Sequence, residues 1–418
     1  MALTINDKTR IEKLKNTIIH YENKIAEDDK PGLWNFSYDL LIKSKKVPLS
    51  DDEEKRIIET LKQRFEKLLK GNNIHAAESA ADLLVDYYER RGKLEEAKSI
   101  LINLGNVIQR NAEQVSALVG AAWLIRLHQL YLRHGLKNEA DKILIKIKEL
   151  GEKGVSELRE ISVSTEISKE ELDDFINKLT EGDSKMAIRR IASFFIPRRY
   201  EVIEQLKEIS KKFPIPFCFP RKMLDSEDRT VATVGSLEDD LEGHLILQIS
   251  QNMDITSFLL EKAVDALIRR FSLNDEVIVS HLYESPIFDE KRRVFLIKGV
   301  KAYLDGDFLT ALHILIPQVE ALIRNLAEKI KVPVLKCSQS GGFYYRVLDD
   351  LLRDENVIKI LGEDICLYFR ILFTDSRGWN LRNEICHGIR PIEKFDKKAS
   401  DRVFHALLCL SLVKEKEI

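Results

Sequence analysis

Arg382 and His387 are the two residues in this sequence whose types and spacing best suit chemistry on a phosphate ester. A histidine titrates near neutrality and can take up or release a proton, while the planar guanidinium of an arginine binds phosphate oxygens. With His387 as general acid or base, Arg382 stabilising the charged phosphorane and Asn383 orienting the backbone or the phosphate, the motif could cleave RNA without a metal ion. The expected products end in a 2′,3′-cyclic phosphate.

One histidine is too few for this reaction in a single protomer. In-line attack by a ribose 2′-OH uses a base on one side of the phosphorus and an acid on the other. On a regular helix, five residues of about 100° each would also place Arg382 and His387 about 140° apart. A two-fold dimer brings two copies of both residues into one cleft. We therefore expect a homodimer formed through the C-terminal domain.

The surrounding sequence resembles a known motif. The run Asp375-Ser-Arg-Gly-Trp-Asn-Leu-Arg-Asn-Glu-Ile-Cys-His-Gly388 resembles the R-x4-6-H motif of HEPN domains, the higher eukaryotes and prokaryotes nucleotide-binding superfamily. Tyr303–Arg324, and Leu361–Asp364 followed by Leu372–His387, are similar to an uncharacterised HEPN-related family that includes the animal endoplasmic-reticulum-membrane-associated RNA degradation protein. The resemblance covers the C-terminal third of the chain. It implies a helical bundle, a metal-independent endoribonuclease with a composite dimer site, RNA as substrate and, in a prokaryotic member, a defence or toxin-like role.

Glu320 is the candidate for a supporting carboxylate. It lies in Pro317–Arg324, where Glu320 and Arg324 are one helical turn apart and are expected to pair. The resemblance implies a polar residue on an earlier helix that supports the motif, and Glu320 matches it best, as a carboxylate that orients Arg382 or His387. The alternative for Glu320 is an ordinary surface pair with Arg324.

The motif also allows a non-catalytic interpretation. Arg382 and His387 could cap and bridge helices in a bundle while Asn383 holds a turn. Glu384 adds a negative charge inside the motif, which would weaken affinity for RNA. The alternative function is therefore a non-catalytic module that binds RNA or nucleotide, or a scaffold that recruits a protein.

Other combinations of reactive residues are weaker candidates for a functional site. Cys386, His387, His405 and Cys409 are zinc-ligand types, but Cys409 lies in an apolar run where a buried cysteine packs as a small hydrophobe. We expect neither a metal nor a cofactor. The sequence lacks a nucleophile elbow, an HExxH motif and a GxGxxG loop, which argues against common hydrolase, zinc-protease and dinucleotide-binding classes. His313 lies among apolar residues and is expected to pack in the core.

The elements that position these residues are predicted to be helices. The 418 residues include only 18 Gly and 10 Pro, with 44% hydrophobic and 32% charged residues. This composition is typical of a helix-rich chain of two or three domains, so we predict an all-α fold. The longest apolar run, Val115–Ile125, is too short to cross a membrane, and the N-terminus lacks the apolar core of a signal peptide. Five cysteines form no CxxC pair, so we expect free thiols in a cytoplasmic protein without membrane contact.

Residues 1–160 are predicted to form an N-terminal helical-hairpin region. Helices are expected over residues 6–29 and 50–71, the second opened by Ser50 and a run of acidic residues. A pattern of tyrosine, glycine, alanine and leucine then occurs twice with the same internal spacing, as Tyr88, Gly92, Ala97 and Leu101 and as Tyr131, Gly135, Ala140 and Leu144. This repeat predicts two tetratricopeptide-like helical hairpins, which pack together or bind a protein partner.

Residues 161–285 are predicted as a middle segment that begins helical and becomes irregular. Ser168 and Glu171 form a capping-box pattern that opens a helix. Phe213–Pro220 contains three prolines and is predicted to be a loop. For Arg229–Ser250, rich in glycine and acidic residues, irregular structure is favoured over a strand.

Residues 286–418 are predicted to form a HEPN-like helical domain. From Lys291 onward, 22 Lys and Arg oppose 17 Asp and Glu, whereas residues 1–290 carry a net charge of −7. A basic bias of this size is compatible with a phosphate-bearing ligand, although solvated helix faces account for most such imbalances. Ser338–Gly342 lacks the lysine of a phosphate-binding loop and is expected to be a flexible loop between helices.

Overall fold

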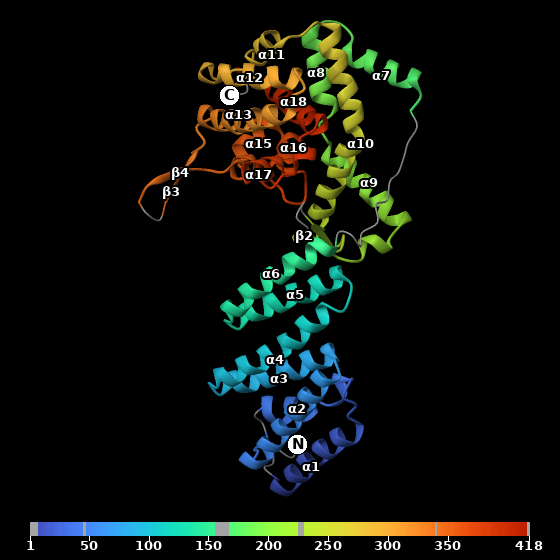
Figure 1. The fold of residues 1–418 in the computed structure, drawn as a ribbon, viewed down its shortest axis with the longest axis vertical. Coiled ribbons are helices and arrows are strands. Elements are labelled where there is room, and N and C mark those ends of the chain that lie inside the picture. The colour runs from blue at the N-terminus through green and yellow to red at the C-terminus, as the bar shows by residue number, and fades with distance from the viewer. Residues whose placement is uncertain (1–6, 45–46, 155–166, 225–229, 339–340, 416–418) are drawn as a thin grey trace. The chain divides into compact units, whose positions relative to one another are not determined.

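The computed structural model shown in Figure 1 describes residues 7–44, 47–154, 167–224, 230–338 and 341–415. These residues form eighteen α-helices and two small sheets of two strands each, which confirms the predicted all-α fold class. The chain divides into two compact units, Met1–Ile161 and Ser162–Ile418. Among the described residues, no helix combines the length and apolar composition that crossing a bilayer requires.

The first unit consists of helices that pack against their neighbours in the chain (Figure 1). Its helices are α1 (Lys8–Ile25), α2 (Asp51–Lys70), α3 (Ile74–Arg90), α4 (Leu94–Ala112), α5 (Ala117–Arg133) and α6 (Lys137–Gly154). Ser50 begins α2 as predicted, because its side chain accepts a hydrogen bond from the Glu53 N–H while the Glu53 carboxylate accepts one from the Ser50 N–H.

The predicted repeat forms two helical hairpins, α3–α4 and α5–α6. Gly92 and Gly135 turn the chain at equivalent places with φ of +70° and +72°, a backbone conformation that favours glycine. The repeat is not exact in its packing, since Leu101 is 1% exposed and its counterpart Leu144 is 48% exposed. The second hairpin therefore has an apolar position facing solvent that the first hairpin buries.

The second unit contains the remaining helices and both sheets. Its helices are α7 (Lys169–Thr180), α8 (Ser184–Phe194), α9 (Arg199–Lys212), α10 (Leu241–Arg270), α11 (Asp275–Leu282), α12 (Arg293–Leu304), α13 (Phe308–Lys329), α14 (Leu348–Leu352), α15 (Glu355–Leu361), α16 (Glu363–Phe373), α17 (Leu381–Cys386) and α18 (Lys397–Ser411). Strand β1 (Arg221–Leu224) pairs antiparallel with β2 (Thr230–Val234), and β3 (Leu335–Cys337) pairs antiparallel with β4 (Phe343–Tyr345).

One hydrophobic core runs through the second unit. Its buried residues extend from Leu179 to Val413, so segments on both sides of the predicted boundary at residue 285 share it. Helix α18 lies at its centre, because every residue from Ala399 to Ser411 is buried. A helix that is buried on all sides must pack against several others, and α18 contacts α8, α10, α11, α13 and α16.

The prediction of irregular structure for Arg229–Ser250 is wrong. Thr230–Val234 is strand β2, and α10 begins at Leu241 after Asp240, whose carboxylate accepts hydrogen bonds from the N–H groups of Gly243 and Gly235. His244 is buried, with its Nε2 3.0 Å from the Gly235 carbonyl oxygen. This tertiary contact folds the glycine- and acid-rich segment back onto the helix. Phe213–Pro220 is a loop as predicted, with one short turn of 3-10 helix at Ile215–Phe217.

Two further expectations differ from the structure. His313 is exposed rather than packed in the core, because the buried stripe of α13 passes through Ala311, Leu312 and Leu315 and leaves position 313 on the opposite face. The segment around Ser338–Gly342 connects the two strands of the β3–β4 hairpin rather than two helices. Within that segment, residues 339–340 lie outside the described residues.

Candidate functional site

The predicted motif lies on α17 and at its end. Asn380 precedes the helix in the left-handed conformation with φ of +50°, and Gly388 follows it with φ of +67°. The helix is therefore limited to Leu381–Cys386, and His387 caps it with φ of −94° and ψ of 0°. Arg382 and His387 thus occupy the first turn and the C-cap of one very short helix.

Arg382 is held in place by two neighbouring acceptors. Its Nε donates to Glu320 Oε2 at 3.1 Å, and its Nη1 donates to Asn383 Oδ1 at 3.1 Å. The side chain is 25% exposed. Within the described part of the chain, Nη2 has no hydrogen-bond partner, so both of its N–H groups remain for a ligand.

Glu320 contacts two arginines at once. Besides Arg382, it accepts a hydrogen bond from Arg324 Nη2 at 2.7 Å through its other carboxylate oxygen. Both features predicted for Glu320 are therefore present, the pair within α13 and the contact with Arg382. One carboxylate between two guanidinium groups leaves this cluster with a net positive charge.

Asn383 connects α17 to the helix before it. Its Nδ2 donates to the carbonyl oxygen of Thr374 at 3.1 Å and to Asn380 Oδ1 at 2.8 Å. Because its Oδ1 accepts from Arg382, the amide links the guanidinium to the end of α16. Asn383 therefore holds the turn at the start of α17.

The imidazole of His387 is exposed. Across the described residues it makes no hydrogen bond or ion pair with Arg382 or with any other side chain, while its backbone N–H donates to the Asn383 carbonyl oxygen at 3.0 Å. The ring is therefore accessible for proton transfer to or from a bound molecule.

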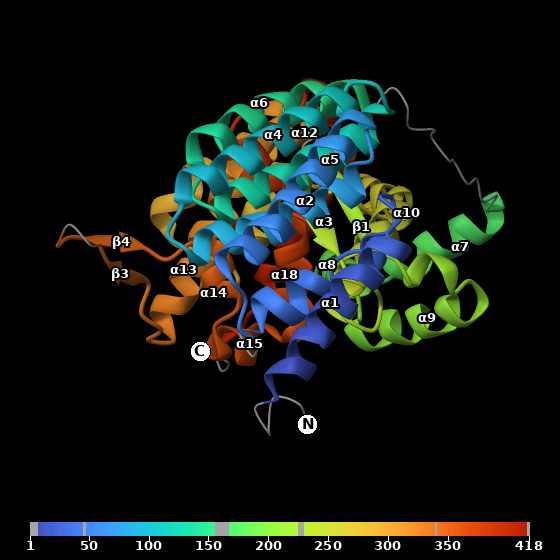
Figure 2. The same cartoon turned by 90° about the horizontal axis from the view of Figure 1, so that it is seen from below.

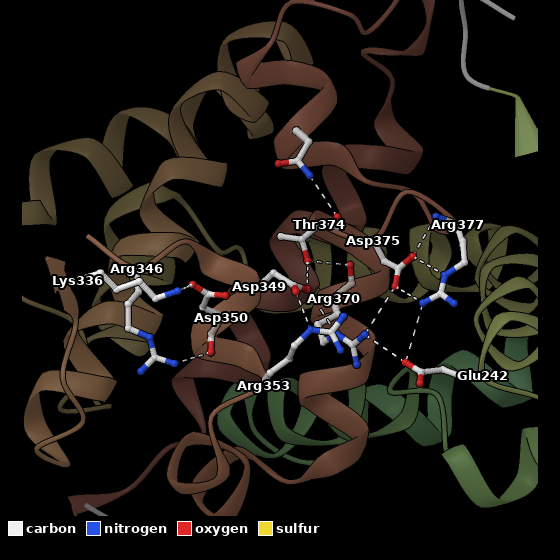
Figure 3. Close-up of polar contacts among 11 residues, drawn as sticks. Glu242, Lys336, Arg346, Asp349, Asp350, Arg353, Arg370, Thr374, Asp375 and Arg377 are labelled. Atoms are coloured by element: carbon white, nitrogen blue, oxygen red, sulfur yellow. Dashed lines mark hydrogen bonds and ion pairs between the residues drawn. The ribbon is translucent and has the colours of Figure 1, made fainter. Parts of the chain in front are cut away.

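The loop between α16 and α17 is held by buried charges that the sequence did not single out. Asp375 accepts a bidentate pair of hydrogen bonds from Arg377, with both N···O distances 2.9 Å. Figure 3 shows Asp375 between Arg377 and Arg370, with Glu242 of α10 close to the same two arginines. Arg370 Nη2 lies 3.3 Å from Glu242 Oε1 and 3.7 Å from Asp375 Oδ2.

Asp349 completes this network on the other face of Arg370. It accepts hydrogen bonds from Thr374 Oγ1 at 3.0 Å and from Arg353 Nε at 2.6 Å, and its Oδ1 lies 3.5 Å from Arg370 Nε (Figure 3). Thr374 is also the residue whose carbonyl oxygen binds Asn383. The charges around Arg370 therefore support the loop that leads into the motif.

The ionisation of Asp375 reflects this arrangement. Burial alone would raise its pKa, but the hydrogen bonds and charge of Arg377, together with the charge of Arg370, leave the pKa of Asp375 below its usual value. Gly378 in the same loop lies close to α16, since an added Cβ would be 2.4 Å from the Ile371 carbonyl oxygen. The loop fits tightly against α16 both sterically and electrostatically.

The four residues weighed as zinc ligands lie in two different environments. Cys386 and His387 are exposed at the end of α17, whereas His405 and Cys409 are buried on α18, where Cys409 Sγ is 3.7 Å from His405 Nε2. Burial and the charge of Arg402 lower the pKa of His405 to about 3. No group of three or more potential metal ligands occurs among the residues that the structure describes.

Comparison with family models, with curated protein sequences and with solved structures gives no match for this chain. Its function is therefore inferred from the motif and from the geometry around Arg382 and His387.

Proposed function

We propose that the second unit is a metal-independent endoribonuclease. The observation that supports this most is the state of Arg382: Glu320 and Asn383 fix two of its nitrogens, and the third has no partner among the described residues. The guanidinium is thus oriented by protein contacts while the N–H groups of Nη2 stay available to a phosphate oxygen. His387 is exposed at the end of the same short helix.

Each side chain of the motif has a separate role in the proposed reaction. Arg382 Nη2 binds a non-bridging phosphate oxygen and stabilises the charge that develops on the phosphorane. His387 removes the proton from the 2′-OH or protonates the leaving 5′-oxygen, and the second of these roles belongs to His387 of the partner subunit in a two-fold dimer. Glu320 and Asn383 are positioning residues that hold Arg382.

The local charge favours a phosphate ligand. The sequence raised the concern that Glu384 would repel RNA, but its Oε2 is 2.8 Å from Arg390 Nη1 and both side chains are mostly buried. The negative charge of Glu384 is therefore compensated, while the cluster of Arg324, Glu320 and Arg382 keeps an excess positive charge.

A second candidate is RNA binding without cleavage. Asn383 holds the turn at the start of α17, as the non-catalytic interpretation of the motif expects. In either case the helical hairpins of the first unit are available for a protein partner, and a defence or toxin-like role remains part of the nuclease proposal.

The test is cleavage of single-stranded and structured RNAs in EDTA by wild type, His387→Ala and Arg382→Ala, with the oligomeric state measured by light scattering. Removing a general acid or base costs about 10²- to 10⁴-fold in rate. The matched controls are His313→Ala, another exposed histidine, and Arg269→Ala, an exposed arginine near the end of α10, which are expected to cleave like wild type.

The proposal stands if both motif variants lose cleavage while they remain folded and keep the wild-type oligomeric state. Cleavage by His387→Ala at the wild-type rate would reject it. Absence of cleavage by wild type, with RNA binding that depends on Arg382, would favour the non-catalytic candidate.

A further inference from the structure

The β3–β4 hairpin projects from the helices of the second unit, as both views show (Figures 1 and 2). Its strands pair in the register Leu335–Tyr345, Lys336–Tyr344 and Cys337–Phe343. Phe343, Tyr344 and Tyr345 are 72%, 51% and 57% exposed. Contiguous exposed apolar surface of this kind commonly marks a site that binds a partner or ligand.

The residues of the hairpin and those just before it carry only basic charges, and nearby acidic residues pair with two of them. Residues 329–346 contain four basic residues and no Asp or Glu. Lys336 and Arg346 anchor the base of the hairpin, the first to Asp350 and the second to the Asp350 carbonyl oxygen at 2.8 Å (Figure 3). The side chains of Lys329 and Lys331 are exposed and make no hydrogen bond or ion pair with any described residue.

The hairpin connects to the motif through direct contacts. The guanidinium carbon of Arg324 lies 4.7 Å from the centre of the Tyr345 ring, within the range of a cation–π contact. Arg324 and Arg382 share the Glu320 carboxylate, with N···O distances of 2.7 and 3.1 Å. A cavity of about 230 Å³ beside Tyr345 is lined by Arg324 and Arg292, among others. The aromatic surface therefore continues into the arginine cluster of the motif.

We propose that this hairpin is a subsite for single-stranded RNA, in which unpaired bases stack on Phe343 and Tyr345 while Lys329 and Lys331 contact the sugar–phosphate backbone. Alternate residues of a strand face the same side, so Phe343 and Tyr345 present their rings on one face of the hairpin. Exposed aromatic rings beside basic side chains are a common means of holding unpaired nucleotides. The subsite extends the proposed nuclease function and rests on it, since it would deliver the strand to Arg382.

Two features of the hairpin surface favour single-stranded RNA as the ligand. A duplex keeps its bases stacked on one another, so its bases offer no free faces to the rings, and the subsite is expected to prefer single strands. The absence of acidic residues from 329 to 346 suits a polyanion better than a protein surface of mixed charge. A protein partner at the hairpin, including a second copy of the chain, is the competing outcome.

The experiment measures binding of the full-length protein to a fluorescent single strand of 2′-O-methyl RNA, which cannot be cleaved through its 2′-oxygen, and to the matching duplex. Stacking on one aromatic residue accounts for about tenfold in affinity, so Phe343→Ala with Tyr345→Ala is expected to weaken single-strand binding by about 100-fold. Tyr345→Phe keeps the ring and is expected to bind like wild type. Tyr200→Ala, which removes another highly exposed aromatic side chain in the same unit, is the matched control.

Replacement of Lys329 and Lys331 by glutamine gives a second readout. Two backbone contacts to a single strand account for a change of about 1.4 in the slope of log affinity against log salt concentration. The double lysine variant is therefore expected to bind with a shallower salt dependence, and an unchanged slope would contradict the assigned lysine contacts.

The subsite is rejected if wild type binds no single strand, if it binds duplex as tightly as single strand, or if the double aromatic variant retains wild-type affinity. An altered oligomeric state of that variant with unchanged RNA affinity would assign the hairpin to a protein contact instead. Failure of the nuclease proposal gives a different pattern, in which single-strand binding still depends on Phe343 and Tyr345 but wild type cleaves no RNA. Cleavage that depends on His387, with binding unaffected by the hairpin variants, would reject the subsite alone.

Discussion

In the first unit helices α2 to α6 each pack mainly against the next or preceding helix in the chain, whereas in the second unit α18 is enclosed by helices from distant parts of the sequence. The first unit therefore obtains its core from local hairpins. The second unit obtains its core from contacts that require the whole domain to be folded. Loss of one hairpin contact is expected to have a local effect in the first unit, while loss of a contact at α18 affects the entire second unit.

The units also differ in what they bury. The fully buried residues of the repeat are apolar, such as Leu101 and Ala140, whereas α18 buries Asp401, Arg402 and His405. Buried polar groups are costly to leave without partners, so they make a structure more sensitive to single substitutions. The helical hairpins of the first unit thus enclose apolar side chains, and that unit's buried polar residues, Lys15, Glu22 and Ser37, lie before the hairpins, whereas the second unit encloses charged side chains in its central helix.

The largest effect on stability is expected at Asp401. This carboxylate is 1% exposed and binds the Tyr303 hydroxyl and Lys397 Nζ, the latter at 2.9 Å. Asp401→Ala removes the carboxylate that Tyr303 and Lys397 bind, and is expected to destabilise the second unit by about 3–5 kcal/mol. Hydrogen exchange measured by mass spectrometry would report this over the whole second unit.

The matched control for Asp401 is Asp265→Ala. Asp265 pairs with the same Lys397 at 3.0 Å but is 31% exposed, so its loss is expected to cost at most about 1 kcal/mol. Equal effects of the two substitutions would show that burial of Asp401 is not what makes it important.

The repeat offers a comparison within the first unit. Leu101→Ala removes a buried side chain and is expected to cost about 3 kcal/mol, whereas Leu144→Ala, at the equivalent exposed position, is expected to cost less than about 0.5 kcal/mol. Hydrogen exchange of the backbone amides in the first unit would measure the loss of stability in both variants. A similar cost at the two positions would contradict the difference in packing between the hairpins.

Acid is expected to weaken the second unit through His405. Burial lowers its pKa to about 3 in the folded state, while the unfolded chain takes up a proton near pH 6.5. Stability contributed by neutral His405 is therefore complete above pH 6.5 and is lost as pH falls towards 3, by about 2 kcal/mol at pH 5.

His405→Leu isolates this effect. It removes the titrating group, so the change in free energy of unfolding between pH 7 and pH 5 is expected to be smaller than in wild type by about 2 kcal/mol. The buried neighbours of His405, the Tyr368 hydroxyl, the Cys409 thiol and Arg402, remain in both proteins. Identical pH dependence in the two proteins would contradict the buried neutral histidine.

A smaller effect is expected at the loop before the motif. Asp375→Asn keeps a hydrogen-bond acceptor for Arg377 but removes the charge that Arg377 and Arg370 face, and is expected to cost about 1 kcal/mol, mainly in the exchange of α17 amides. Glu363→Gln, at an exposed position in the first turn of α16, is the control and is expected to leave α17 unchanged. Faster exchange throughout the second unit would mean that the loop contributes to the global fold.

Local signals in the sequence were sufficient for many elements of the fold. Ser50 and Ser168 mark the starts of two helices because a capping box involves residues only three apart. The start of α10 also has a local cap, since Asp240 accepts a hydrogen bond from the Gly243 N–H, but the glycine and acidic residues before it were interpreted as irregular structure. The burial of His244 against the Gly235 carbonyl oxygen had no local signal. The β3–β4 hairpin had a local signal, the aromatic run Phe343–Tyr345 after two glycines, but strands of three residues give little periodicity.

The candidate site likewise contains some contacts that the sequence predicted and others that it did not. The contact of Glu320 with Arg382 was predicted, because the motif and the resemblance together pointed to a carboxylate on an earlier helix. The arrangement of Glu242 and Asp349 around Arg370 was not predicted, because Glu242 comes from a distant helix and nothing in its local sequence indicates that contact. Ion pairs between distant segments depend on tertiary packing that single-sequence patterns do not encode.

The proposal that Arg382 and His387 act on RNA is tested most directly by analysing the ends of RNA products formed in EDTA by wild type, His387→Ala and His313→Ala. We predict 2′,3′-cyclic phosphate ends from wild type and His313→Ala, and loss of these products in a folded His387→Ala protein. Cyclic phosphate ends formed equally by His387→Ala would contradict the assignment of the site.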